Sequence, residues 1–141
     1  MKLQNATALV TGANRGIGRA FVQALLIAGV QKVYATARDL QTLEAVTALD
    51  PARVIPVQVD VTDLNGVSRL SEQAADVNLL INNAGVLSFG NILDIPVETI
   101  HQQFDTNFYG TLNMARAFVP GMERNGGGAI VNILTLVALA S

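Results

Sequence analysis

Three closely spaced glycines near the N-terminus are the residues best suited to hold a ligand. Gly12, Gly16 and Gly18 follow an apolar run at residues 6–10 and open a segment with helical spacing of apolar residues. Glycine lets the backbone turn sharply and lets a ligand approach it closely. A helix N-terminus presents unpaired N–H groups and a positive dipole end to an anion. The pattern predicts a turn that binds nucleotide phosphates; taken alone, such spacing also fits a tight turn without a ligand.

Two arginines indicate which nucleotide this turn would bind. In dinucleotide-binding folds, an acidic residue about 20 positions beyond the glycines accepts hydrogen bonds from the adenosine ribose. Arg38 occupies that position here, with Asp39 after it, and Arg15 lies inside the glycine turn. A guanidinium matches a 2′-phosphate in charge and in donor geometry, so NADP(H) is favoured over NAD(H). Alternatively, Arg38 is an exposed residue paired with Asp39, and Arg15 is an ordinary surface cation.

The composition argues against several other kinds of site. The chain of 141 residues has no cysteine and a single histidine, His101, so we expect neither disulfides nor a metal site. A net charge of −2 with nine Lys and Arg residues gives no basic face for nucleic acid. No apolar run approaches the roughly 18 residues of a membrane span, and the N-terminus lacks the apolar core of a signal peptide. We therefore expect a cytoplasmic protein with a small-molecule partner.

The order of elements along the chain predicts how these residues are positioned. Strands are expected at residues 6–10, 32–37, 53–59, 77–81 and 129–134, and helices at residues 16–28, 40–49, 64–75 and 96–124. In the first helix Ile17, Phe21 and Leu25 form an apolar face, while Asp39 and Pro96 suit helix N-termini. Apolar strands that alternate with helices indicate a doubly wound α/β fold, with helices on both faces of a parallel sheet. Without a linker or repeat, residues 1–141 form a single domain.

Two further segments carry a resemblance to a known family. Residues 79–85, Leu-Leu-Ile-Asn-Asn-Ala-Gly, close the fourth strand, and Phe104-x-x-Asn107-x-x-Gly110 lies in the long helix. Together with the glycine turn and Asp60-Val61-Thr62, they resemble the short-chain dehydrogenase/reductase family in order and spacing, over essentially the whole chain. The resemblance implies a Rossmann-type domain and an NADP-dependent oxidoreductase. Such an enzyme moves a hydride between the cofactor and a small carbonyl or alcohol, and is a homo-oligomer.

The resemblance also assigns cofactor contacts. The residues implied to surround the phosphates are Gly12, Asn14, Arg15, Gly16, Ile17 and Gly18. Asp60 would accept from the adenine amino group beside the backbone of Val61, with a role as a helix N-cap as the alternative for this carboxylate. Asn83, Ala84 and Gly85 would lie along the cofactor. Asn82 and Asn83 would also tie neighbouring strands together.

Two residues match catalytic positions of the family. Asn107 matches an asparagine that holds a water molecule linking a lysine to solvent, and a plain structural hydrogen bond is the alternative. Thr135 matches the catalytic serine and keeps the hydroxyl that would hydrogen-bond a substrate carbonyl. Its methyl group restricts χ1, so a degenerate site is the alternative at this position.

The family's proton-donating tyrosine and its lysine have no counterparts in the sequence. Neither Tyr34 nor Tyr109 begins a Tyr-x-x-x-Lys pattern. We therefore expect a C-terminally truncated portion of a longer enzyme, inactive by itself, with an apolar sheet edge at residues 129–134 and an uncovered helix face at Phe104 and Phe108. The alternative is a non-catalytic NADP(H)-binding or redox-sensing module. A methyltransferase is disfavoured because it gives no role to residues 82–85.

Overall fold

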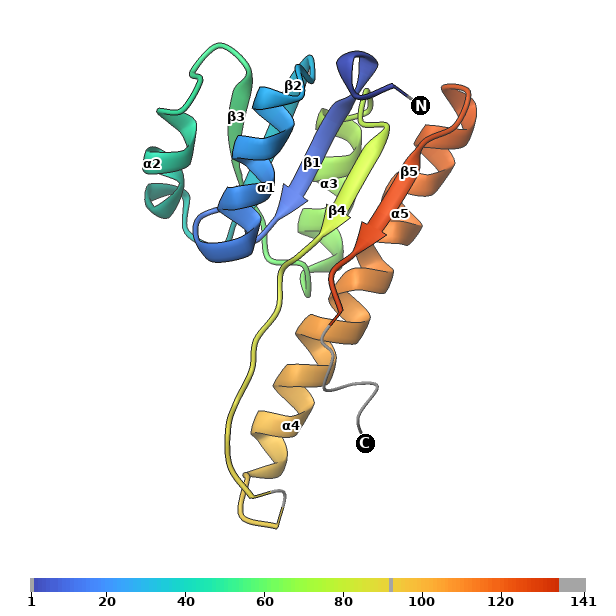
Figure 1. The fold of residues 1–141 in the computed structure, drawn as a ribbon. Coiled ribbons are helices and arrows are strands. Elements are labelled where there is room, and N and C mark those ends of the chain that lie inside the picture. Colours follow the sequence, from blue (N-terminus) through green and yellow to red (C-terminus); the bar gives the residue numbers. More distant parts are fainter. Residues whose placement is uncertain (1, 92, 135–141) are drawn as a thin grey trace.

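The core of the fold is a parallel sheet of five strands. The computed structural model describes residues 2–91 and 93–134. The strands are β1 (Thr7–Thr11), β2 (Lys32–Ala37), β3 (Val54–Gln58), β4 (Leu79–Asn82) and β5 (Ala129–Asn132). Their order in the sheet is β3-β2-β1-β4-β5 (Figure 1). The predicted strands are confirmed, with ends that differ by at most two residues. Because the order reverses beside β1, a crevice forms at the carboxyl ends of β1 and β4.

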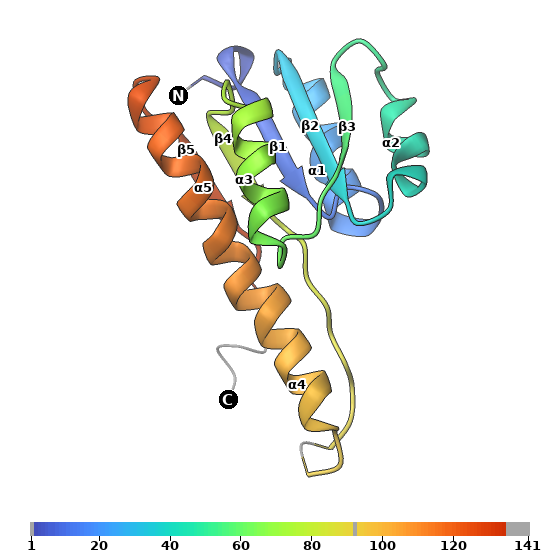
Figure 2. The same ribbon diagram turned by 180° about the vertical axis from the view of Figure 1, so that it is seen from behind.

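Helical segments connect the strands and cover both faces of the sheet. They are η1 (Leu3–Asn5), α1 (Gly16–Ile27), η2 (Leu40–Leu43), α2 (Glu44–Thr47), α3 (Leu64–Gln73), α4 (Val97–Phe104), η3 (Asp105–Gly110) and α5 (Thr111–Arg124). α1 and α2 lie over one face, and α3 and α5 lie over the other (Figure 2). The predicted doubly wound α/β architecture is therefore confirmed.

Each face of the sheet has its own hydrophobic core. Alternate residues of β1 point to opposite faces, so Val10 packs with Val22 of α1, while Leu9 packs with Leu70 of α3 and Met114 of α5. All five side chains are between 0% and 2% exposed. Full burial of an aliphatic side chain of this size contributes about 1.5–3 kcal/mol. These two cores hold rigid the strand ends from which the site is built.

The helix predicted at residues 40–49 is wrong in type and length. A 3₁₀ segment, η2, is followed by the single helical turn α2. The Thr42 hydroxyl donates to the Asp39 carbonyl at 2.6 Å, which an α-helix would use for a backbone bond. As predicted, Asp39 caps the segment, because its carboxylate accepts from the backbone N–H of Gln41.

The long helix predicted at residues 96–124 is continuous but not regular. Pro96 is the N-cap of α4 rather than part of its first turn, and η3 is a wider π-helical turn between α4 and α5. Gly110 closes η3 against Val61, where an added Cβ would lie 2.5 Å from Val61 Cγ2. Such turns are rare and frequent at functional sites. This one contains Asn107.

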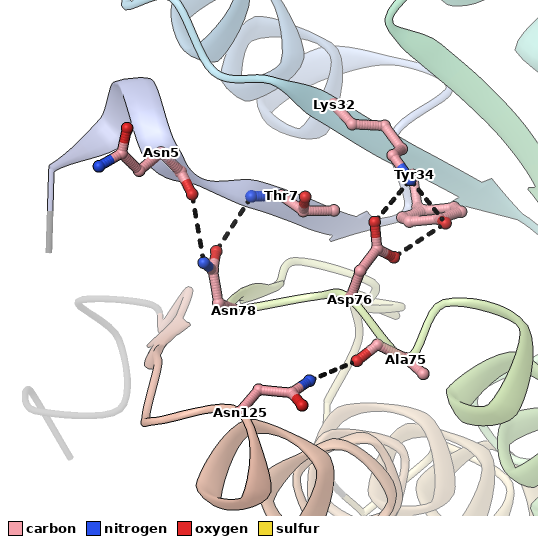
Figure 3. A network of polar contacts seen from close by, with 8 residues as sticks. All are labelled: Asn5, Thr7, Lys32, Tyr34, Ala75, Asp76, Asn78 and Asn125. Atoms are coloured by element: carbon pink, nitrogen blue, oxygen red, sulfur yellow. Dashed lines mark hydrogen bonds and ion pairs between the residues drawn. The ribbon is translucent and has the colours of Figure 1, made fainter.

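The segment between α3 and β4 is hydrogen-bonded to three other elements at the opposite end of the sheet (Figure 3). Asp76 accepts from two side chains of β2, through Oδ2 from Lys32 Nζ at 2.5 Å and through Oδ1 from the Tyr34 hydroxyl at 3.0 Å. Asn78 Oδ1 accepts from the backbone N–H of Thr7 at 3.0 Å. The carbonyl of Ala75 accepts from Asn125 Nδ2 at 2.8 Å. These bonds fix the start of β1 and β2 and the end of α5.

One edge of the sheet and one helix face remain apolar and exposed. β5 is an edge strand with Ile130 and Val131 at 37% and 38% exposure, as predicted, and Phe104 and Phe108 are 59% and 58% exposed. α4 and the segment after β4 extend together beyond the carboxyl edge of the sheet (Figure 1). Within the residues that the structure describes, no helix has the length and apolar character needed to cross a membrane.

Candidate functional site

A cleft of about 480 Å³ lies at the carboxyl ends of the strands, within the usual size of ligand sites. It collects residues that are far apart in the sequence. Those predicted to contact a cofactor and found in its wall are Gly12, Asn14, Arg15, Gly16, Ile17, Arg38, Asp60, Val61, Asn83, Ala84 and Gly85. Their individual roles stay predictions, but the structure brings them to one place.

The glycine turn needs its glycines for two different reasons. Gly12 and Gly16 have φ values of 63° and 52°, a left-handed conformation that side chains disfavour. Gly18 does not line the cleft. It is buried in α1, where an added Cβ would overlap the carbonyl oxygen of Gly12 and lie 2.6 Å from Asn83 Nδ2. Gly18 therefore lets α1 pack against the turn.

The N-terminus of α1 faces the cleft with free donors. Arg15 is the N-cap residue, and its side chain makes no capping hydrogen bond. The first N–H groups of a helix have no partner within the helix. They carry the positive end of the dipole of a 12-residue helix. The turn thus fits the phosphate groups of a dinucleotide. Ile17, predicted both as part of the apolar face of α1 and as a cofactor contact, is 62% exposed and lines the cleft, so it does not belong to the buried face.

Two arginines border the same cleft without a carboxylate partner. In the described part of the chain, neither Arg15 nor Arg38 takes part in an ion pair. The alternative in which Arg38 pairs with Asp39 is therefore not observed. The Asp39 carboxylate accepts from the backbone of Gln41 instead. Two exposed guanidinium groups beside one cleft can bind an anion, and two carboxylates, of Asp39 and Asp60, lie in the same wall.

Asp60 lies in the wall of the cleft and is held by the loop after β3. Its Oδ1 accepts from the backbone N–H of Thr62 at 2.9 Å and from the Thr62 hydroxyl at 2.7 Å. The N-cap of α3 is Asp63, whose side chain accepts from Asn65 N. The capping alternative for Asp60 is therefore wrong. Asp60 Oδ2 has no partner among the described residues and can accept a further hydrogen bond.

Asn83 joins β4 to the glycine turn. Its Nδ2 donates to the carbonyls of Thr11 and Gly12 at 3.0 and 3.1 Å. The hydroxyl of Thr11, which is 1% exposed, accepts from the backbone N–H groups of Asn83 and Ala84, both at 2.9 Å. Asn82 Nδ2 donates to Asn132 Oδ1 at 2.9 Å. The predicted ties between neighbouring strands are therefore confirmed.

Asn107 lies next to the cleft rather than in its wall. Both ends of its amide bond to the backbone of Val86, and the adjacent Thr106 lines the cleft. The structure thus shows the structural hydrogen bonds that were the alternative for this residue. Its proposed relay role stays a prediction. Thr135, the second catalytic candidate, lies outside the described residues.

The cleft also contains residues that sequence reasoning missed: Thr36, Ala37, Asp39, Thr42, Val59, Val86 and Thr106. All but Thr36 and Thr42 flank a predicted site residue; Thr36 lies one residue before the end of β2, and Thr42 lies in η2. Position at the carboxyl end of a strand is the signal that could have found most of them. Among the described residues, no group of three or more His, Cys, Asp or Glu side chains could hold a metal ion.

Sequence comparison decides the family. The model of the short chain dehydrogenase family matches residues 6–141. The chain belongs to the short-chain dehydrogenase family. The glycine turn and residues 83–85 of this short-chain dehydrogenase chain line one cleft and are joined by the Asn83 side chain, although about 70 residues separate them in the sequence.

Curated relatives of this short-chain dehydrogenase chain include sugar-alcohol and sugar enzymes. Galactitol 2-dehydrogenase of Agrobacterium fabrum is 34% identical over 138 residues, which cover 94% of this chain and 54% of that protein. L-xylulose reductase of Mus musculus is 36% identical over 132 residues, with 93% and 53% covered. The chain therefore spans about half the length of the curated relatives that it matches.

Solved structures agree with the fold. A short-chain dehydrogenase from Burkholderia cenocepacia, in complex with NADP, superimposes with a TM-score of 0.91 and 40% identity. The match covers 100% of this chain and 58% of that one. The bulky-bulky ketone specific alcohol dehydrogenase from Comamonas testosteroni has a TM-score of 0.87 and 26% identity, with 97% and 57% covered.

Proposed function

We propose that the protein is an NADP(H)-dependent oxidoreductase that interconverts a carbonyl and an alcohol. The observation that carries the proposal is the cleft itself. It combines a helix N-terminus without a side-chain cap with Arg15, Arg38 and Asp60 Oδ2, none of which has a side-chain partner among the described residues. The related protein from Burkholderia cenocepacia is in complex with NADP, which supports the same cofactor here.

In this proposal the chain's own residues bind and orient the cofactor. The N-terminus of α1 holds the pyrophosphate, and Arg38 and Arg15 bind the 2′-phosphate. Asp60 Oδ2 accepts from the adenine amino group. Residues 83–85 lie along the cofactor, where their small side chains permit close approach. The bound dinucleotide supplies the hydride that is exchanged with the substrate.

The catalytic half of the proposal rests on Asn107 and Thr135. Thr135 orients the substrate carbonyl through its hydroxyl, and Asn107 positions the Gly85–Val86 segment and contributes to the proton relay. A tyrosine and a lysine of a longer protein complete the relay, so the 141-residue chain alone is inactive. General acid catalysis of this kind is worth about 10²–10⁴-fold in rate.

The proposal includes assembly into a homo-oligomer. The exposed aromatic side chains Phe104, Phe108 and Tyr109 of α4 and η3, between 52% and 59% exposed, support it. Exposed apolar groups that lie together on one element commonly mark protein–protein contacts. Light scattering of the full-length protein measures the state directly.

Turnover by the full-length protein tests the proposed activity. NADPH oxidation is followed by nicotinamide absorbance against a panel of ketones and aldehydes that includes sugar substrates. The proposal expects carbonyl-dependent oxidation with at least one of them. Tight NADPH binding without turnover of any carbonyl, or of any alcohol with NADP⁺, would contradict the enzyme and favour a cofactor-binding module.

A further inference from the structure

The backbone that carries Arg38 is held by hydrogen bonds as it leaves β2. Two carbonyls before this residue have donors from other segments: Thr36 O accepts from Ala13 N and Ala37 O from Val59 N, both at 2.9 Å. The carbonyl after it, Asp39 O, accepts locally from Thr42 Oγ1 at 2.6 Å. The carbonyl of Arg38 has a different kind of donor. Gln58 Nε2 donates to it at 2.9 Å.

Gln58 is well placed to extend the sheet by one bond. It is the last residue of β3 and stands opposite Ala37 in the β2–β3 register. The regular ladder ends there, and the Gln58 side chain holds the next carbonyl along β2. It is absent from the wall of the cleft, whereas Arg38 is part of that wall. The Gln58 side chain can therefore influence a ligand through the Arg38 backbone that it holds.

We propose that Gln58 is a positioning residue that orients Arg38 toward the 2′-phosphate of NADP(H). The inference rests on the proposed NADP(H) preference of the cleft. A guanidinium binds a phosphate through a planar fork of donors, so its strength depends on alignment. The Gln58 bond fixes the backbone position from which the Arg38 side chain starts, while the exposed side chain itself has no ion pair in the described part of the chain.

Binding of two nucleotides to the full-length protein isolates this effect. 2′,5′-ADP and 5′-AMP differ only in the 2′-phosphate, and both Kd values are measured by calorimetry. Gln58→Met keeps the length of the side chain and removes its donor. We expect this variant to bind 2′,5′-ADP about two- to tenfold more weakly, the range of a single hydrogen bond, with the Kd for 5′-AMP unchanged.

A double-mutant cycle shows whether the effect passes through Arg38. In an Arg38→Ala background, Gln58→Met should cause no further loss of 2′,5′-ADP affinity, because coupled residues are not additive. Gln73→Ala is the matched control, since Gln73 is exposed on α3 and its side chain makes no hydrogen bond to the described residues. This control should bind both nucleotides like the wild type.

The outcomes separate the two proposals. If the wild type binds 2′,5′-ADP no more tightly than 5′-AMP, the proposed NADP(H) preference fails and the role of Gln58 fails with it. If the wild type has the preference but Gln58→Met leaves it unchanged, only the role of Gln58 is overturned. Equal loss of both nucleotides, or a full effect of Gln58→Met without Arg38, also overturns that role and indicates general support of the fold.

Discussion

Asn107 and Val86 are joined by two hydrogen bonds of 2.8 Å. Asn107 Oδ1 accepts from Val86 N, and Nδ2 donates to Val86 O. Asn107 lies in the π-helical turn η3, and Val86 lies in the segment that leaves β4 beside the cleft. The Asn107 side chain thus makes to this segment the two backbone hydrogen bonds that a neighbouring strand would otherwise make. The geometry makes Asn107 the link between the long helix and the cleft wall.

Replacing Asn107 should loosen this segment. Asn107→Ala removes both bonds, each worth about 0.5–1.5 kcal/mol, so the free energy of unfolding should fall by about 1–2 kcal/mol. The Val86 amide should exchange with solvent faster, as measured by hydrogen exchange. Asn65→Ala is the control, because the Asn65 side chain is exposed and makes no hydrogen bond to the described residues. Unchanged Val86 exchange in Asn107→Ala would refute the link.

The buried hydroxyl of Thr11 should be indispensable to the cleft. Thr11→Val keeps the shape but leaves two backbone N–H groups, of Asn83 and Ala84, without their acceptor. We expect a loss of about 2 kcal/mol or more in the free energy of unfolding, together with weaker cofactor binding.

Thr36→Val is a matched control for this prediction. Thr36 is also 1% exposed, but its hydroxyl makes one long bond of 3.4 Å, to the Val10 carbonyl. Thr36→Val should lower the free energy of unfolding by about 1 kcal/mol or less. Urea unfolding measures both variants, and equal losses would show that the Thr11 contacts have no special weight.

Two glycine-to-alanine variants should have opposite effects. Gly18→Ala brings a Cβ into the Gly12 carbonyl and should lower the free energy of unfolding by about 1–3 kcal/mol or more. In Gly121→Ala the nearest atom, Arg124 Nη2, is 3.8 Å away. Because Gly121 is inside α5, alanine should stabilise the helix by up to about 1 kcal/mol. Thermal unfolding checks both signs, and a harmless Gly18→Ala would contradict the packing described for the turn.

Acid should weaken the ties around Asp76. Partial burial raises the pKa of Asp76, but the hydrogen bonds from Lys32 and Tyr34 lower it by more, so the pKa lies below the ordinary 3.8. A carboxyl with a lowered pKa stabilises the fold above its unfolded pKa and loses this effect as the pH falls through the folded value. The contribution of Asp76 should therefore be lost below about pH 3.8.

The contribution of Lys32 to stability depends on pH with the opposite sign. Its hydrogen bond to Asp76 raises the pKa of Lys32 above 10.5, so its contribution is complete below that pH and is lost only above it. Urea midpoints of wild type and Asp76→Asn should differ by a constant amount between about pH 5 and 9 and converge in acid. Glu123→Gln, at an exposed residue without a side-chain bond to the described residues, is the control. A gap that persists in acid would contradict the charge argument.

The sequence predicts the sheet well because its signals are local. Apolar runs bounded by turn residues locate the five strands, and alternation with helices gives their parallel arrangement. Gly12 and Gly16 indicate the turn, because only glycine readily adopts the positive φ values that it requires. Residues 82–85 lie next to that turn in space, since both follow neighbouring strands, and this could be inferred from the topology.

The features that were missed depend on contacts between distant segments. The π-helical turn η3 could not be predicted, because the sequence pattern of its residues does not differ from that of an ordinary helix. The helical spacing of Ile17 does not show that this side chain is exposed; its place in the cleft follows from the resemblance alone. Residues 40–43 form a 3₁₀ segment, in which the Asp39 carbonyl accepts from both the backbone N–H and the hydroxyl of Thr42, and their sequence does not indicate this form. Gln58 of β3 bonds to the Arg38 carbonyl at the end of the neighbouring strand β2, which no local pattern shows.

The ratio of the Kd values for NADH and NADPH tests whether Arg38 gives the cleft its preference for NADP(H). It is measured by calorimetry on the full-length wild type and on Arg38→Ala. Charge-assisted hydrogen bonds are worth about 1.5–3 kcal/mol, so wild type should bind NADPH about 10- to 100-fold more tightly than NADH. Arg38→Ala should remove most of this preference and leave NADH binding almost unchanged. Equal affinities in the wild type, or equal losses for both cofactors in Arg38→Ala, would contradict the account.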